Sequence, residues 1–100
     1  STIRTPYLDK FATISTVFDS AYLCSFPTVP ARFEFLTGNV AFPTRGWQLM
    51  PTDQTTLAER LREVGYISMG IFDTSNLMRQ GYNYMKGFNA FEWVRGQEGD

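Results

Sequence analysis

The chain has 100 residues, of which 43% are hydrophobic and 16% aromatic, and its formal net charge is −1. This length fits one domain, residues 1–100, with one modest core, and the composition is that of a folded chain, not a disordered one. The nine basic residues do not cluster, which argues against nucleic acid as a partner, and no apolar run approaches the roughly 20 residues of a membrane-spanning helix.

The first half of the chain predicts two helices separated by a strand. Residues 5–15 predict a helix, because a proline fits its first turn and apolar residues recur at helical spacing. Residues 16–23 alternate between two faces and contain β-branched and aromatic side chains, which predicts a strand. A short helix should then begin at Thr28, with that residue as its cap, and end at Gly38 in the left-handed conformation.

The second half predicts a helix between a loop and a buried strand. Glycine and proline punctuate residues 39–52, which is typical of a loop. The helix that follows has Asp53 as its expected cap and Gly65 as its expected end. Residues 66–72 are mostly apolar, as in a strand of a parallel sheet, and residues 92–96 are predicted to form a short terminal strand after an irregular segment.

Strands that alternate with helices predict an α/β fold in which helices flank a parallel sheet. Two main strands are few for such a sheet, so the chain resembles a slice of a wider one. Free sheet edges are templates for strand pairing between molecules. We therefore expect self-association through the exposed edges.

Cysteine and histidine usage limits the chemistry that the chain can perform. There is one cysteine, Cys24, and no histidine. A single cysteine cannot form an internal disulfide, so the sequence leaves the cellular compartment undetermined. Without histidine, the serine and cysteine triads that use an imidazole base are excluded, and the commonest zinc ligand is missing. Any chemistry must use hydroxyls, carboxylates, arginine and lysine, or groups supplied from elsewhere.

The stretch "SFPTVPARFEFLTG", residues 25–38, combines a hydroxyl, a rigid backbone and a guanidinium. If Thr28 lies at a helix start, backbone N–H groups and the helix dipole favour a phosphate or sulfate group beside it. Arg32 lies four residues on, one helical turn away, and its planar fork can bind two oxygens of a tetrahedral anion. The simpler alternative is a helix cap with a solvated arginine.

Four collinear stretches carry a resemblance to a known family. They are "TPYLDKFA", "VFDSAYLCSFPTVPARFEFLTG", "TLAERLREVGY" and "GYNYMKGFNAFEWVRGQEGD". In this order they resemble blocks from the N-terminal part of the sulfatase family, within the alkaline-phosphatase superfamily. The resemblance implies a fragment of a three-layer α/β catalytic domain that lacks the first strand and the C-terminal part.

The family pattern also implies which residue is the nucleophile. In that pattern the nucleophile precedes a proline by two positions and an arginine by four. Thr28 fits, with Pro30 and Arg32 at those offsets, whereas Cys24 does not. The resemblance therefore implies Thr28 and Arg32 as catalytic residues, with Thr28 also a metal ligand in the intact protein. Cys24 is then expected to be a small buried residue at a strand end, and formylglycine is not available.

The resemblance further implies a divalent metal, Ca, Mn or Zn, in the intact protein, and none for this chain alone. Asp73 follows a predicted strand, where α/β folds place functional groups, so Asp73 and Asn76 are candidates for substrate binding. The alternative for both is a turn or helix cap. The stretch "DTSNL" departs from the family, because Thr74 stands where lysine is usual and Asn76 where histidine is usual.

A threonine nucleophile cannot release sulfate by collapse to an aldehyde, as formylglycine does, and its covalent ester must be cleaved by water. The resemblance thus implies hydrolysis of small-molecule sulfuric or phosphoric esters, with phosphate monoesters or diesters favoured. We expect little catalysis from these residues alone. The alternative is a non-catalytic α/β binding module derived from a degenerate member of the family.

Overall fold

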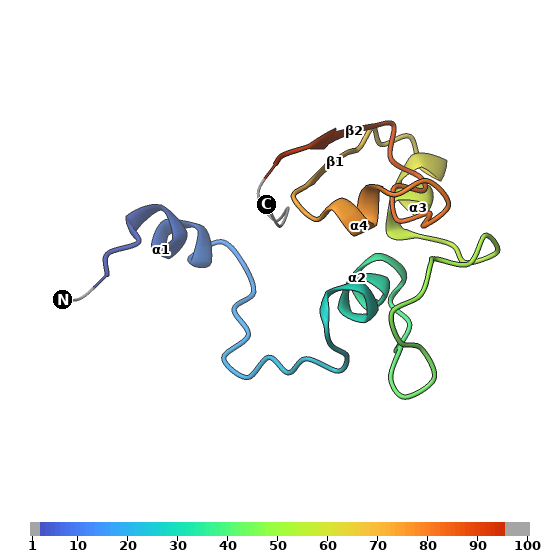
Figure 1. The fold of residues 1–100 in the computed structure, drawn as a ribbon. Coiled ribbons are helices and arrows are strands. Elements are labelled where there is room, and N and C mark those ends of the chain that lie inside the picture. The colour runs from blue at the N-terminus through green and yellow to red at the C-terminus, as the bar shows by residue number, and fades with distance from the viewer. Residues whose placement is uncertain (1–2, 96–100) are drawn as a thin grey trace.

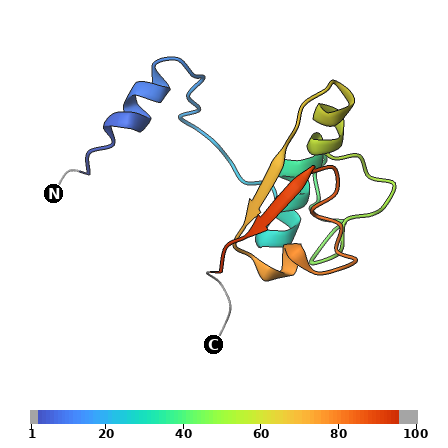
Figure 2. The same ribbon diagram turned by 90° about the horizontal axis from the view of Figure 1, so that it is seen from above.

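The computed structural model describes residues 3–95, apart from the side chains of Asn76 and Met78. Its elements are α1 (Pro6–Ala12), α2 (Thr28–Thr37), α3 (Leu57–Glu63), β1 (Met69–Phe72), α4 (Ser75–Met78) and β2 (Ala90–Trp93). Figures 1 and 2 show α2 and α4 beneath one face of the β1–β2 sheet. No described element covers the opposite face, and α1 lies apart from this body at the end of an extended segment.

The sheet is parallel, as predicted. Met69 pairs with Ala90 at one end of the register, and Phe72 pairs with Trp93 at the other. A strand was predicted at residues 92–96, and β2 begins two residues earlier because its register is set by pairing with β1. Within the described part of the chain, neither strand has a second neighbour, so both outer edges of the sheet are open.

The helix predicted to begin at Thr28 and to end at Gly38 is confirmed. Gly38 has φ = 71°, the left-handed conformation that glycine adopts without a steric penalty. Val29 and Phe33 lie one turn apart and are buried, which fixes the inward face of α2. The expected cap was wrong, however: the N-cap residue is Pro27, and Thr28 already has helical backbone.

The cap of α3 also differs from the expectation. The N-cap residue is Thr56, and Asp53 lies in the preceding turn. The Thr56 hydroxyl accepts the Glu59 N–H at 3.3 Å, while the Glu59 carboxylate accepts the Thr56 N–H at 2.9 Å. This reciprocal capping box pairs two N–H groups at once, which a single side chain at Asp53 cannot do.

The core lies between α2, α4 and the segment before β2. Its buried members are Val29, Phe33, Ala41, Met50, Leu77 and Tyr84. The Tyr84 hydroxyl donates to the carbonyl of Gln48 at 3.1 Å, so this buried phenol is hydrogen-bonded. Burial raises the pKa of Tyr84. Tyr84 also belongs to the same buried cluster as Val29 and Phe33, which joins the irregular segment around residues 79–88 to α2.

The strand predicted at residues 16–23 does not form. Every residue in this range is exposed, and Tyr22 is 89% exposed. A strand needs a hydrogen-bonding neighbour, and none of the described residues supplies one here. The expectation that Cys24 is buried at the end of that strand is therefore wrong as well, because Cys24 is a free, exposed thiol.

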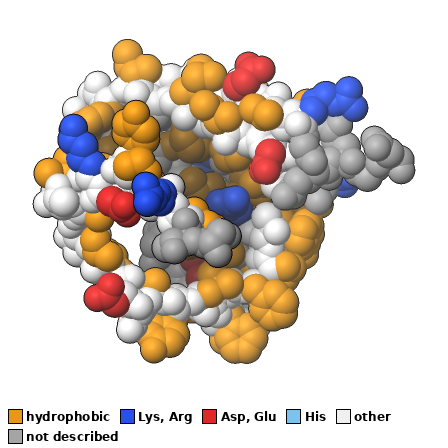
Figure 3. All heavy atoms as spheres, turned by 90° about the vertical axis from the view of Figure 1, so that its left-hand side faces the viewer, with side chains coloured by type: hydrophobic (Ala, Val, Ile, Leu, Met, Phe, Trp, Pro, Cys, Tyr) orange, Lys and Arg blue, Asp and Glu red, His pale blue; other side chains and the backbone are white. Residues whose placement is uncertain are grey.

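The N-terminal segment keeps its hydrophobic side chains on the surface. No residue of α1 is buried, and Tyr7 and Phe11 are 88% and 63% exposed. Figure 3 looks onto this side of the molecule and shows hydrophobic side chains spread over much of it, between scattered charged groups. Across residues 3–95, no helix has the length and apolar character needed to cross a membrane.

Candidate functional site

Thr28 and Arg32 line the same pocket at the N-terminal end of α2. The pocket has a volume of about 330 Å³, and Leu23, Phe26 and Phe35 contribute its apolar wall. Thr28 is half-buried and Arg32 is exposed, so neither lies in the hydrophobic interior. The spacing of four residues places both side chains on one face of α2. The structure thus brings together the hydroxyl and guanidinium that the sequence singled out; their catalytic roles stay predictions.

Both polar groups are free for a ligand. Because Pro27 occupies the N-cap position, the Thr28 hydroxyl is not used to cap α2. Among the residues that the structure describes, neither Thr28 nor Arg32 has a side-chain hydrogen bond or ion pair. The ten-residue helix α2 also directs its first N–H groups toward this end. The N-terminal end of α2 is therefore electropositive, which favours an anion.

A second, smaller pocket connects Arg32 with Asp73. Its volume is about 150 Å³, and its wall includes Phe35 and Leu77. Asp73 is exposed and lies directly after β1, at the carboxyl end of the strand. Its carboxylate accepts a hydrogen bond from the Thr74 hydroxyl at 3.2 Å. Arg32 therefore borders one pocket together with Thr28 and another together with Asp73.

Asn76 is placed by its backbone alone. It lies in α4, one turn after Asp73, near the same end of β1. Its side chain is outside the described part of the structure, so its predicted role in substrate binding remains a prediction.

The described residues do not form a metal site by themselves. No group of three or more aspartate, glutamate, histidine or cysteine side chains comes together anywhere in residues 3–95. A hydroxyl such as that of Thr28 is a single ligand, whereas divalent cations take several oxygen ligands. The expected metal therefore fits this chain only if most of its ligands come from outside the described residues.

Sequence reasoning missed two residues next to the pocket, Ser25 and Glu34. The Ser25 hydroxyl donates to Glu34 Oε1 at 2.5 Å and accepts the Phe42 N–H at 2.9 Å. Glu34 Oε1 also accepts the Ala41 N–H at 2.8 Å. The hydrogen bond from Ser25, followed by that from Ala41, lowers the pKa of Glu34. Nothing in the spacing of a serine and a glutamate nine positions apart signals this arrangement.

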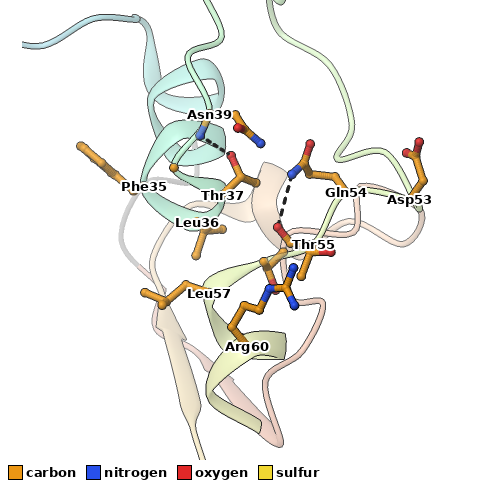
Figure 4. Close-up of a pocket in the computed structure, with 11 residues that line it drawn as sticks. Phe35, Leu36, Thr37, Asn39, Asp53, Gln54, Thr55, Leu57 and Arg60 are labelled. Atoms are coloured by element: carbon orange, nitrogen blue, oxygen red, sulfur yellow. Dashed lines mark hydrogen bonds between the residues drawn. The ribbon is translucent and has the colours of Figure 1, made fainter. Parts of the chain in front are cut away.

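A larger pocket lies elsewhere and contains none of the predicted site residues. It has a volume of about 550 Å³ and lies between the C-terminal half of α2 and the start of α3. Figure 4 shows its polar side chains, among them Asn39, Gln54 and Arg60. Arg60 pairs with Glu63 at 3.2 Å, and both side chains are largely exposed. Phe35 is the one residue that this pocket shares with the Thr28 pocket.

Comparison with known proteins identifies the family. The sulfatase family model matches residues 1–98. The iduronate 2-sulfatases of Mus musculus and Homo sapiens are each 28% identical to the chain over 75 residues, which is 69% of this chain and 14% of the relative. The chain thus spans about one seventh of the length of these relatives. No solved structure gives a significant match.

The two-stranded parallel sheet with its helices is consistent with a fragment of the alkaline-phosphatase-like fold. The chain belongs to the sulfatase family.

Proposed function

We propose that the protein hydrolyses sulfuric or phosphoric esters of small molecules, with Thr28 as the nucleophile and Arg32 as the group that binds the tetrahedral anion. The observation that carries this proposal is that the two side chains line one pocket while neither has a structural partner within the described residues. A polar pair that stabilises nothing else in the fold is available to a ligand. Family membership supports an ester of this kind as the substrate class.

The reaction divides into two displacements for a phosphate ester. In the first, Thr28 Oγ forms a bond to phosphorus, the bond to the leaving alcohol breaks, and the proton of the hydroxyl goes to that alcohol. In the second, water attacks phosphorus, the bond to Thr28 Oγ breaks, and the threonine regains a proton. Arg32 and the electropositive end of α2 stabilise the negative oxygens in both steps. Asp73 and Asn76 are proposed to contact the remainder of the substrate.

Phosphate esters suit this mechanism better than sulfate esters. A threonine lacks the second hydroxyl through which a formylglycine hydrate expels sulfate. The covalent ester of Thr28 can therefore be cleaved only by hydrolysis. A divalent metal on the Thr28 oxygen remains part of the proposal, since it would lower the pKa of that hydroxyl. The described residues hold no cluster of acidic or cysteine side chains that would complete the coordination of such a metal.

A second candidate is a non-catalytic α/β binding module. It is favoured by "DTSNL", where Thr74 and Asn76 replace the lysine and histidine of the family pattern. Thr74 is buried, so it does not reach a ligand as an exposed lysine would. The binding module predicts an intact anion pocket without turnover.

The test compares Thr28→Ala and Thr28→Ser in the protein at its natural length, with nitrophenyl phosphate mono- and diesters and nitrophenyl sulfate as substrates. We expect Thr28→Ala to lose about a thousandfold or more in kcat, as when other nucleophiles are removed, and Thr28→Ser to retain measurable turnover. Normal phosphodiester turnover by Thr28→Ala would contradict the proposal. Phosphate binding by a wild-type protein that hydrolyses none of the three esters would favour the binding module.

A further inference from the structure

We infer that Ser25 and Glu34 are positioning residues that hold the Thr28 hydroxyl at the pocket, an inference that rests on the proposed function. Neither residue lines the Thr28 pocket, so neither is expected to touch substrate. Both act instead through the turn that leads into α2.

Ser25 is the point at which the N-terminal segment is attached to the body. Of the described residues before α2, Ser25 alone is buried, with 3% of its surface exposed. Its neighbours Cys24 and Phe26 are exposed. A buried polar side chain needs hydrogen-bond partners, and the Ser25 hydroxyl has them in Glu34 and in the N–H of Phe42.

The hydrogen bonds of Ser25 lead to a rigid part of the fold. Its hydroxyl contacts Glu34, in the middle of α2, and the N–H of Phe42, in the loop after α2. Glu34 is joined to the same loop through the N–H of Ala41. Ala41 is fully buried and belongs to the core cluster, so this point of the loop is anchored in the core. We call the set of Ser25, Glu34 and these two N–H groups the entry clamp.

The entry clamp determines where α2 begins. Only Phe26 and Pro27 separate Ser25 from Thr28, and both of them line the Thr28 pocket. Pro27 is also the N-cap residue of α2. Without the Ser25 hydroxyl, this short connection would lose its attachment to α2 and to the loop after it. The orientation of the Thr28 hydroxyl would then no longer be fixed. Arg32 lies one turn further into the helix, and α2 holds it independently of the clamp.

A displaced nucleophile slows the chemical step, whereas substrate binding through Arg32 should persist. Misplacement of a reacting group by about 1 Å can cost about a hundredfold in rate. We therefore expect Ser25→Ala, in the protein at its natural length, to lower kcat about tenfold or more while KM stays within about twofold. Glu34→Ala should lower kcat to the same extent. The double variant should be no slower than either single variant, because the two residues act as one unit.

Two further variants separate positioning from general destabilisation. Glu34→Gln keeps an amide oxygen that can accept from both Ser25 and Ala41, so it should retain most of the activity. Thr37→Ala is the matched control: its hydroxyl donates to the Phe33 carbonyl at 2.8 Å and accepts the Asn39 N–H at 3.1 Å, at the other end of α2. Thr37→Ala should lower the melting temperature and leave kcat unchanged.

Amide hydrogen exchange at Phe42 reports the entry clamp without reference to activity. We expect exchange of the Phe42 N–H to be at least about tenfold faster in Ser25→Ala than in wild type, since the N–H loses its acceptor. Faster exchange with unchanged kcat would overturn the positioning role and leave the proposed function standing. An inactive wild type with a protected Phe42 N–H would refute the proposed function, and the positioning role with it, while the clamp itself would be confirmed. Unchanged exchange in Ser25→Ala would refute the clamp.

Discussion

At the scale of single residues, the candidate site consists of two polar side chains, Thr28 and Arg32, that make no hydrogen bond or ion pair within the described residues. Thr28 would ordinarily be read as a helix cap, but Pro27 takes that position and leaves the hydroxyl free. Arg32 is likewise exposed and, within residues 3–95, has no acidic partner. Substitutions at these two residues should therefore change function and leave stability almost untouched. Ser25 is the opposite case, because it is buried and fully hydrogen-bonded.

The first prediction concerns Arg32. Arg32→Lys keeps the charge but loses the planar fork that binds two oxygens, so we expect kcat/KM to fall about 10- to 100-fold, or about 1.4–2.7 kcal/mol of transition-state stabilisation. The free energy of unfolding should change by less than about 0.5 kcal/mol, as for other exposed substitutions. Steady-state kinetics and urea denaturation measure the two quantities. Arg62→Lys, on the exposed surface of α3, is the control and should change neither. A large loss of stability in Arg32→Lys would show that the guanidinium has a structural role.

Some residues in and around the pocket could be predicted from the sequence, and others could not. Helical periodicity predicts that Thr28 and Arg32 lie on one face of a helix, and the position of Asp73 follows from its place after a strand. Both inferences use local rules that operate within one element or at its end. The pairing of Ser25 with Glu34 was missed, because it depends on how the chain returns to α2 in three dimensions. No periodic pattern encodes such a contact.

At the scale of elements, the helices were predicted better than the strands. A helix forms its hydrogen bonds within one segment, so apolar periodicity placed α2 and α3 even though the expected N-cap residue of each helix was wrong. The cap of α3 was nevertheless assigned to Asp53, although Thr56 and Glu59 have the spacing of a capping box. A strand depends on a partner elsewhere in the chain. Residues 16–23 have the alternating pattern but no partner among the described residues, and they remain irregular.

The second prediction tests the cap of α3. Thr56→Ala removes the capping hydroxyl and also its hydrogen bond to the Lys86 carbonyl at 3.0 Å. We expect a loss of about 1–2 kcal/mol in the free energy of unfolding, the upper part of the range for cap substitutions. Urea denaturation measures it. Asp53→Ala is the control and should be neutral, because Asp53 is exposed and lies outside the capping box. A larger loss of stability in Asp53→Ala than in Thr56→Ala would show that Asp53 is the cap of α3.

At the scale of the whole molecule, much hydrophobic surface is left uncovered. One face of the sheet has no described element over it, and Met69 and Ile71 of β1 are 54% and 67% exposed. Parallel sheets are normally covered on both faces. The N-terminal segment adds exposed aromatic side chains, such as Tyr7 and Tyr22. The described residues form a two-stranded parallel sheet, which is consistent with a fragment of a larger fold.

The third prediction follows from these open edges and faces. In solution, the 100-residue chain should self-associate, since strand edges and apolar faces both favour contact between copies. Light scattering should show an average mass that rises above 11.4 kDa with concentration. Met69→Lys places a charge on the open side of β1 and should reduce this rise. A mass that stays at 11.4 kDa over the whole concentration range would contradict self-association.

The central claim is that Thr28 forms a covalent ester with the substrate, and acid quenching of a single turnover tests it most directly. The protein at its natural length is mixed with a nitrophenyl phosphate ester, quenched within one turnover, and digested for peptide mass spectrometry. The account predicts one added phosphoryl group on the peptide that contains Thr28, and none in Thr28→Ala. A phosphoryl group on another residue of the wild-type protein would contradict it. Full turnover by Thr28→Ala, with no adduct on that variant, would contradict it as well.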